Sequence, residues 1–522
     1  MTERLARSAG LIGLATSTSR VLGLVRDQVT AGYFGTGAAA DAFTVGTRIP
    51  TLLRDLFAEG AMSAAFVPTI TRYLKTGGKA AAWRLGSLVV NSLLIVTGVI
   101  VMLGIVFAAP LAHSYAPGYI DTPEKIALTT LITRVNMPFL LLVAIAAAFM
   151  GMLNSLRRFF IPATSPALYN IVFILCTIVF VPVFSRLGLQ PVMALSAGML
   201  LGGVAQVVVQ WPVLRHEGYR HQWILDPTDR GLREVLILMG PATLGVAAAQ
   251  INLFVSTSLA TSHDGAAAAL SYAFRLIYVP IGIVGVSVAT AAIPDLAGHA
   301  ASAALREMRA TVSWGLRLML MLSVPAVVGM MVLARPIVEL LFQFGHFDAN
   351  STLLVSNALF FYAPGILGYS AVKLASPGFY SLQDARTPAT VSAVSILVNL
   401  VLNIWLNSTR LQFLGLALGT AIAANVNAGV LLYLLSRRLD GIDGARVARA
   451  FVKILIASIV MGVAAYYTEL GLHRLWPDPW WVPRAVRVGG AIGVALAVLA
   501  LAAMALRIEE FGQAMRRVLR RK

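Results

Sequence analysis

Long apolar stretches separated by short polar segments run along the whole 522-residue chain. A helix needs about 20 mostly apolar residues to cross a bilayer, and the chain contains about fourteen such stretches. The pattern therefore predicts an all-α integral membrane protein with about fourteen transmembrane helices. The expected spans are 8–32, 41–71, 85–110, 127–153, 163–184, 191–213, 234–260, 266–295, 311–333, 350–381, 388–407, 412–435, 450–470 and 487–506.

The composition agrees with this pattern. Hydrophobic residues make up 58% of the chain and charged residues 12%, whereas about a quarter of a soluble protein is charged. The net charge is +18, and most of the basic residues lie in the polar segments between apolar stretches. They are explained by membrane topology, so no nucleic-acid partner is expected. With one cysteine, Cys176, neither an internal disulfide nor a cysteine-based metal site can form. We find no catalytic constellation, ATP-binding loop or metal-ligand spacing, and we expect neither an enzyme nor a cofactor.

The basic residues indicate the topology. With a cytoplasmic amino terminus, roughly 25 Lys and Arg residues fall in inner loops and roughly 7 in outer loops, which is the bias of the positive-inside rule. Both termini are then expected in the cytoplasm. An alternative role for some of these charges is contact with lipid headgroups.

The prolines indicate an internal repeat. At a constant offset of 226, Pro68, Pro110, Pro138 and Pro162 correspond to Pro294, Pro336, Pro364 and Pro388. Each pair falls at the same place in the hydropathy pattern, and six spans per copy make the two copies parallel, as in some transporters. We predict an amino-terminal lobe at 1–220, a carboxy-terminal lobe at 221–440, and two further spans with a basic cytoplasmic tail at 441–522.

The first two spans contain charged residues at depths where lipid should exclude them. In the first span, Arg20 and Asp27 share one helical face, and Arg26 lies beside it. The charged stripe of the second span is Asp41, Arg48, Asp55 and Glu59, with Arg54 beside it. These stripes cannot face lipid, so they are expected to face water or partner side chains.

Two interpretations of the stripes remain open. In one, they form internal salt bridges, with Arg20 paired to Asp27 and Arg48 to Asp55. In the other, the arginines outnumber the nearby acids and line a cationic central cavity. Because arginine offers two parallel N–H donors and stays charged, such a cavity suits a phosphate-bearing substrate and not a cationic drug.

Several short segments of the chain form a distinctive set. The first segment is Ser19-Arg20-Val21-Leu22-Gly23-Leu24-Val25-Arg26-Asp27. Those of the second span are Asp41-Ala42-Phe43, Leu53-Arg54, Phe57-Ala58-Glu59-Gly60-Ala61 and Ala65-Phe66-Val67-Pro68. Later segments are Ala116-Pro117-Gly118, Gly240-Pro241-Ala242, Leu341-Phe342-Gln343-Phe344-Gly345 and Pro377-Gly378-Phe379-Tyr380-Ser381 with Gln383-Asp384. Together they cover most of the chain and resemble the MurJ/MviN family, whose members flip lipid II, the undecaprenyl-pyrophosphate-linked peptidoglycan precursor.

The resemblance implies the fold of the MOP exporter superfamily, with two six-helix lobes around a central cavity and two carboxy-terminal helices. It also implies that the pyrophosphate is held by Arg20, Arg26, Arg54 and Arg275. We add Arg48 from the charged stripe to this substrate-binding set. The expected gate residues or charge partners are Ser19, Asp27, Asp41, Asp55 and Glu59.

The chain departs from the family pattern at several positions. In some members acids flank the eighth-span arginine, whereas Phe274 and Tyr278 stand there in this chain, so a gate or proton role has no carboxylate at these positions. Asp55 stands where a second arginine is often found. Some members bind sodium, for which Asn399 and Asn403 are a weak candidate site; interhelical hydrogen bonding is the alternative.

The expected function is alternating-access flipping of lipid II from the cytoplasmic to the outer leaflet of the bacterial inner membrane. The resemblance also implies a hydrophobic groove for the polyprenyl tail at the last two spans, and the cell-wall synthesis machinery is a candidate partner. The alternatives are a flippase for another polyprenyl-pyrophosphate oligosaccharide, a multidrug or cation antiporter of the same superfamily, and a membrane scaffold that transports nothing.

Overall fold

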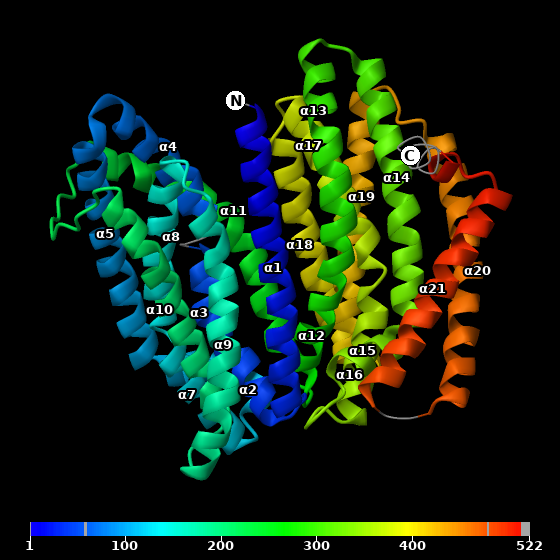
Figure 1. The fold of residues 1–522 in the computed structure, drawn as a ribbon, viewed down its shortest axis with the longest axis horizontal. Coiled ribbons are helices and arrows are strands. Elements are labelled where there is room, and N and C mark those ends of the chain that lie inside the picture. The colour runs from blue at the N-terminus through cyan, green and yellow to red at the C-terminus, as the bar shows by residue number, and fades with distance from the viewer. Residues whose placement is uncertain (1, 57–59, 478–479, 513–522) are drawn as a thin grey trace. The chain divides into compact units, whose positions relative to one another are not determined.

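The computed structural model describes residues 2–56, 60–477 and 480–512 (Figure 1). Within these ranges the chain forms helices joined by short connections, and no strand is present. The helices divide into two compact units. The first unit consists of Met1–Ala268 with Phe344–Phe347, and the second of Ala269–Gln343 with Asp348–Lys522.

The first unit contains eleven α-helices and one short 3-10 helix among its described residues. They are α1 (Thr2–Phe34), α2 (Ala38–Gly46), α3 (Arg48–Arg54), α4 (Gly60–Thr76), α5 (Gly78–Val106), α6 (Ala108–Tyr115), η2 (Pro117–Tyr119), α7 (Pro123–Asn136), α8 (Phe139–Ser155), α9 (Phe160–Arg186), α10 (Met193–His216) and α11 (Arg230–Ala260).

The second unit begins within α12, and the π-helix η3 follows α12 directly. Its elements are α12 (Ala266–Pro280), η3 (Ile281–Gly285), α13 (Val286–Ala301), α14 (Leu305–Val332), α15 (Ala334–Phe342), α16 (Ala349–Tyr362), α17 (Gly365–Ser381), α18 (Arg386–Asn407), α19 (Phe413–Arg438), α20 (Gly444–Leu475) and α21 (Trp481–Ala505).

Apolar side chains are exposed in rows along single helices. On α5 the row contains Val99, Met102 and Val106, which recur every three or four residues and therefore lie on one helix face. A similar row on α18 contains Leu397, Val401 and Trp405. Water would drive such rows together, whereas hydrocarbon solvates them. The prediction of an all-α, multi-pass membrane protein is confirmed.

The number of spans differs from the sequence-based count. Among the described residues, ten segments are long and apolar enough to cross a bilayer, or eleven if α16 and α17, which are bent by 44°, count as one span. Helices α1 and α11 have 33 and 31 residues but are not among the ten. Helices α1 to α3 carry the described residues of the charged stripes or lie directly beside them, which lowers the hydropathy of this region. The count of fourteen stays a prediction.

The prolines of the repeat occupy matching places in the secondary structure. Pro138 directly precedes α8, and Pro364 directly precedes α17, because proline cannot donate a backbone hydrogen bond inside a helix. Two more pairs are each the third residue of their helices: Pro110 and Pro336 in α6 and α15, Pro162 and Pro388 in α9 and α18. This agreement supports the internal repeat. The division at residues 220 and 440 stays a prediction.

The connection between α10 and α11 is fastened to α5. The Asn91 side-chain amide donates to the backbone carbonyls of Gln222 and Ile224 at 2.7 and 2.8 Å. Arg84 forms an ion pair with Asp229, the residue that caps the start of α11, at 2.8 Å. These contacts hold the connection against the first unit, where α11 packs on α4.

At the other end of α11, the backbone of η2 approaches very closely. The Gly118 N–H donates to Thr261 Oγ1 at 3.2 Å. A Cβ atom at position 118 would lie 2.3 Å from the Thr261 carbonyl oxygen. Only glycine fits this contact, which gives the segment Ala116-Pro117-Gly118 a structural reason for its glycine.

We expect Gly118→Ala to lower the free energy of unfolding by about 1–3 kcal/mol, because a side chain forced into a packed contact displaces backbone. Thermal unfolding of the purified full chain in detergent measures this. Gly98→Ala on α5 is the matched control, since a Cβ there meets no atom within 4 Å. An unfolding temperature equal for Gly118→Ala and the wild type would contradict the close contact.

Candidate functional site

Arg26 is held at the contact between α1 and α9. Its guanidinium Nε and Nη2 donate to Asp27 Oδ1 at 3.3 and 3.0 Å, and Nη1 donates to Asn170 Oδ1 at 3.2 Å. The guanidinium carbon also lies 5.4 Å from the ring centroid of Phe173 and 5.9 Å from that of Tyr169, within cation–π range. Arg26 is therefore a positively charged group in a fixed position.

Ser19 and Arg20 precede this contact on α1. The Asn170 amide donates to the Ser19 backbone carbonyl at 3.1 Å, so Ser19 contributes to the α1–α9 contact through its backbone. The Arg20 side chain is exposed. On α1, the Arg20 guanidinium is therefore accessible to a ligand, whereas the Arg26 guanidinium is held in place by Asp27 and Asn170.

Arg54 pairs with its neighbour Asp55 at the end of α3. Its Nε and Nη2 donate to Asp55 Oδ1 at 2.9 and 2.6 Å. The second carboxylate oxygen accepts from Gln250 of α11 at 2.9 Å. Asp55 thus links α3 to α11. Arg48, the first residue of α3, is half-buried.

The salt bridges differ from those of the sequence-based alternative. Asp27 pairs with Arg26 and Asp55 pairs with Arg54, the arginine directly before each. The alternative had paired them with Arg20 and Arg48. The long guanidinium side chain reaches back to the adjacent carboxylate, which needs less extension than a residue seven positions away. Arg20, Arg26, Arg48 and Arg54 still outnumber Asp27 and Asp55. Glu59 lies outside the described residues.

Asp41 lies in a separate polar cluster. Its side chain is 0% exposed and accepts from Lys125 Nζ at 2.9 Å. It also accepts from the backbone N–H groups of Gly265 and Ala268, at 2.7 and 2.9 Å. Because the first N–H groups of a helix have no partner within it, Asp41 satisfies the start of α12.

Lys125 joins Asp41 to the connection between α11 and α12. Its side chain is 3% exposed, and its Nζ also donates to Asp264 Oδ1 at 2.8 Å. The ammonium group lies 4.0 Å from the ring centroid of Tyr119. Asp264 is 96% exposed, and Lys125 holds the pKa of its carboxyl below the usual value. We name Asp41, Lys125 and Asp264 the acid–lysine cluster. The charge partner of Asp41 is thus Lys125, a residue outside the charged stripes.

Sequence analysis missed Lys125, Asn170 and Gln250. Lys125 follows a proline at the start of α7, so its sequence context is that of a loop residue. Asn170 and Gln250 are uncharged residues inside apolar stretches, where a polar side chain usually bonds to another helix. A polar residue inside an apolar stretch was therefore the signal that could have identified them, although it does not show which residue is the partner.

In the second unit, Arg275 is exposed on α12. Phe274 and Tyr278, which flank it, form an aromatic contact with ring centroids 5.1 Å apart and ring planes at 74°. The two positions that carry acids in some family members therefore hold an aromatic pair.

Asn399 and Asn403 are both buried on α18. α18 packs against α19, and a Cβ at Gly419 would meet the Asn403 side chain at 2.4 Å. Among the described residues, no group of three or more His, Cys, Asp or Glu side chains is placed to hold a metal ion. This close packing is a contact between α18 and α19 and not a hydrogen bond, so the cation site and interhelical hydrogen bonding both stay predictions.

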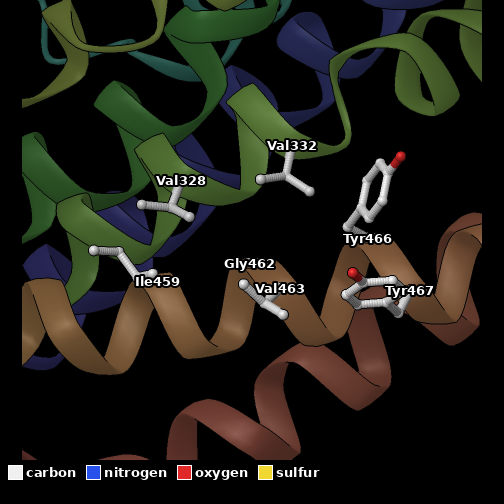
Figure 2. Close-up of a pocket in the computed structure, with 7 residues that line it drawn as sticks. All are labelled: Val328, Val332, Ile459, Gly462, Val463, Tyr466 and Tyr467. Atoms are coloured by element: carbon white, nitrogen blue, oxygen red, sulfur yellow. The ribbon is translucent and has the colours of Figure 1, made fainter.

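An apolar groove with a volume of about 580 Å³ lies between α14 and α20 of the second unit (Figure 2). α14 contributes two valines, and α20 contributes the remaining side chains. The lining residues are Val328, Val332, Ile459, Gly462, Val463, Tyr466 and Tyr467. Of the last two spans, α20 lines this groove, and its other wall is α14 and not α21. The groove expected between the last two spans stays a prediction.

We expect Lys125→Met to lower the free energy of unfolding by about 3–5 kcal/mol, because the buried Asp41 carboxylate loses its counter-charge. Asp264→Asn is the matched control and should change it by less than about 1 kcal/mol, since that carboxylate is exposed. Chemical unfolding in detergent measures both.

The double variant Asp41→Asn with Lys125→Met sharpens this test. Removing both charges leaves no buried ion unpaired, so the double variant should be more stable than Lys125→Met alone. Additive losses from the two substitutions would show that the charges are not coupled.

Comparison with known proteins places the chain in a family. The family model described as lipid II flippase MurJ matches residues 30–482. A probable lipid II flippase MurJ from Haemophilus influenzae is 34% identical over 473 residues, which cover 87% of this chain and 90% of that protein.

Solved structures show the same fold. A structure described as lipid II flippase MurJ in an inward closed conformation has a TM-score of 0.77 at 23% identity, over 95% of this chain and 99% of that chain. An inward-facing multidrug resistance MATE family transporter of the MOP superfamily has a TM-score of 0.65 at 17% identity, over 81% and 94% of the two chains. The chain shares the fold of these structures and belongs to the MurJ family of lipid II flippases.

Proposed function

We propose that this protein moves lipid II, a polyprenyl-diphosphate-linked peptidoglycan precursor, from the cytoplasmic to the outer leaflet of the bacterial inner membrane. The observation that carries the proposal is the family match over residues 30–482, in a chain that keeps arginines inside its spans. Both termini are then cytoplasmic, and the cell-wall synthesis machinery is the partner that supplies and uses the lipid.

The diphosphate is the part of the substrate that the arginines hold. Arg20 is exposed on α1, and Arg54 is partly exposed at the end of α3, so both can present paired N–H donors to phosphate oxygens. Arg26 acts as a fixed positive charge beside them. Arg48 and Arg275 complete the substrate-binding set.

The neighbouring aspartates make this binding reversible. A transported anion must bind strongly enough to enter and weakly enough to leave, as in other membrane pathways. Asp27 and Asp55 already occupy two N–H donors each of Arg26 and Arg54. A phosphate competes with these carboxylates, so its departure returns Arg26 and Arg54 to their aspartate partners.

The acid–lysine cluster acts as the outer gate. It fastens the start of α12 to α2 and α7 through charge-assisted bonds of 2.7 to 2.9 Å. Alternating access requires two states, and breaking these bonds exposes the otherwise buried Asp41 to water. Asp264, which is exposed already, gives water a route to Lys125.

The apolar groove between α14 and α20 receives the polyprenyl tail. Its lining is aliphatic and aromatic, so it offers a hydrocarbon chain the same environment as the bilayer. The tail then stays in apolar surroundings while the charged headgroup passes.

The antiporter alternative has less support. The similarity to a MATE transporter is one of fold, at 17% identity. A site for a cationic drug needs unpaired carboxylates, whereas Asp27 and Asp55 are both paired with arginine.

Single replacement of Arg20, Arg26, Arg54 or Arg275 by alanine should slow lipid II translocation at least tenfold, since a charged hydrogen bond contributes about 1.5–3 kcal/mol. The measurement is arrival of lipid II in the outer leaflet of vesicles that contain the purified chain. Arg386→Ala, an exposed arginine at the start of α18, is the control and should keep wild-type rates. Undiminished translocation by all four variants would refute the assigned roles.

Depletion in the native host separates the alternatives. Loss of a lipid II flippase should cause lipid-linked peptidoglycan precursor to accumulate, followed by lysis. Sensitivity to drugs without a cell-wall defect would instead support the antiporter.

A further inference from the structure

An aromatic cluster in the second unit has no part in the diphosphate binding described above. Its centre is Phe274 of α12, whose ring centroid lies 5.1 Å from Tyr278, 5.3 Å from Tyr362 and 6.3 Å from Tyr369. The rings come from three helices, α12, α16 and α17. Contacts of this kind stabilise fixed, edge-on arrangements of rings.

The cluster extends from the interior to the surface. Tyr362 is buried, Phe274 and Tyr369 are half-buried, and Tyr278 is 56% exposed. Tyr278 meets Phe274 at 74°, so the buried part of the cluster holds the exposed ring in a defined orientation. A large exposed ring supported in this way is a preformed surface for a ligand.

Two cationic side chains lie on the same helix faces as these tyrosines, one on α12 and one on α17. Arg275 precedes Tyr278 by three residues on α12, and Lys373 follows Tyr369 by four residues on α17. Residues at these spacings are neighbours on a helix surface. Both cations are exposed. We name Phe274, Arg275, Tyr278, Tyr362, Tyr369 and Lys373 the aromatic–cationic face.

The position of the cations excludes hydrocarbon as the occupant of this face. Arg275 lies nine residues after the start of α12, and Lys373 lies eight residues after the start of α17, well inside both helices. Placing an ionised side chain against lipid at such depth costs about 2.5–3.5 kcal/mol on insertion scales. The exposed part of the face therefore meets polar groups, whether of the protein, of water or of a ligand, and not hydrocarbon.

We infer that the aromatic–cationic face binds the saccharide attached to the diphosphate of the lipid-linked substrate, an inference that rests on the proposed function. A sugar ring has an apolar C–H face, which packs on an aromatic ring, and polar groups around its edge. Tyr278 supplies the ring and a hydroxyl group. Lys373 supplies N–H donors to hydroxyl, amide or carboxylate oxygens of the headgroup, and Arg275 remains with the diphosphate.

Binding of two lipids by the full chain in nanodiscs tests this subsite. The probes are lipid II and undecaprenyl diphosphate, which has the same tail and diphosphate but no saccharide. Tyr278→Ala should weaken lipid II binding about tenfold, the factor that corresponds to an aromatic contact of up to about 1.5 kcal/mol. Binding of undecaprenyl diphosphate should stay unchanged.

Further variants separate the contributions of the Tyr278 ring, its bulk and the Lys373 charge, and they show whether a loss of binding comes from misfolding. Tyr278→Phe should bind lipid II almost as well as the wild type, because it keeps the ring. Tyr278→Leu keeps the bulk without the ring and carries the test if the alanine variant does not fold. Lys373→Met should also weaken lipid II alone. The matched control is Tyr433→Ala, a tyrosine on α19 that is 59% exposed and lies outside this face.

The outcomes separate the subsite from the proposed function. Equal losses for both lipids, or no loss for either, would overturn the saccharide subsite. A wild-type chain that binds neither lipid would overturn the proposed function itself. Arg20→Ala should weaken both lipids together, which is a different pattern from that of Tyr278→Ala.

Discussion

An ionised side chain inside an apolar helix is stable only when a counter-charge, water or a bound ligand compensates the loss of solvation. The first unit is arranged around this constraint. Arg26 and Arg54 each meet the carboxylate of the next residue, and buried Asp41 meets Lys125. The contacts that satisfy these charges also join α1 to α9, α3 to α11 and α2 to α7. Charge compensation and helix packing are therefore the same set of interactions.

The degree of burial separates two kinds of charge. In the acid–lysine cluster, both carboxylate oxygens of buried Asp41 already accept hydrogen bonds from protein groups. The donors are Lys125 and the backbone N–H groups at the start of α12. The stability of this cluster comes from short bonds in a medium of low dielectric constant. The arginine pairs are partly exposed, so their N–H donors can be shared with an incoming anion. The same fold thus contains a buried ion pair suited to holding a gate shut and partly exposed ion pairs suited to exchanging one anion for another.

The second unit offers surfaces of a different chemistry. The groove between α14 and α20 is lined by aliphatic and aromatic groups, whereas the face around Tyr278 combines rings with two cations. A lipid-linked saccharide has three parts, a hydrocarbon tail, a diphosphate and a sugar. Arginines, an apolar groove and an amphipathic aromatic surface are the matching chemistries. The replacement of acids by Phe274 and Tyr278 fits this division, since aromatic residues add contact area beside Arg275 without adding negative charge.

The sequence by itself determined the membrane class and the helical fold, because hydropathy is a local property of the chain. Proline placement, which is also local, indicated the internal repeat. It also identified the arginines, since a charge in an apolar stretch is visible without a structure. Partners were decided by tertiary structure. Lys125 meets Asp41 across 84 positions, Asn170 meets Arg26 across 144, and Gln250 meets Asp55 across 195. Side-chain spacing placed Asp27 with Arg20, but the Asp27 carboxylate meets the guanidinium of Arg26, the residue directly before it. Arg26 in turn meets Asn170 of α9. Rotamers and helix packing decide which atoms meet, and spacing along the chain fixes neither.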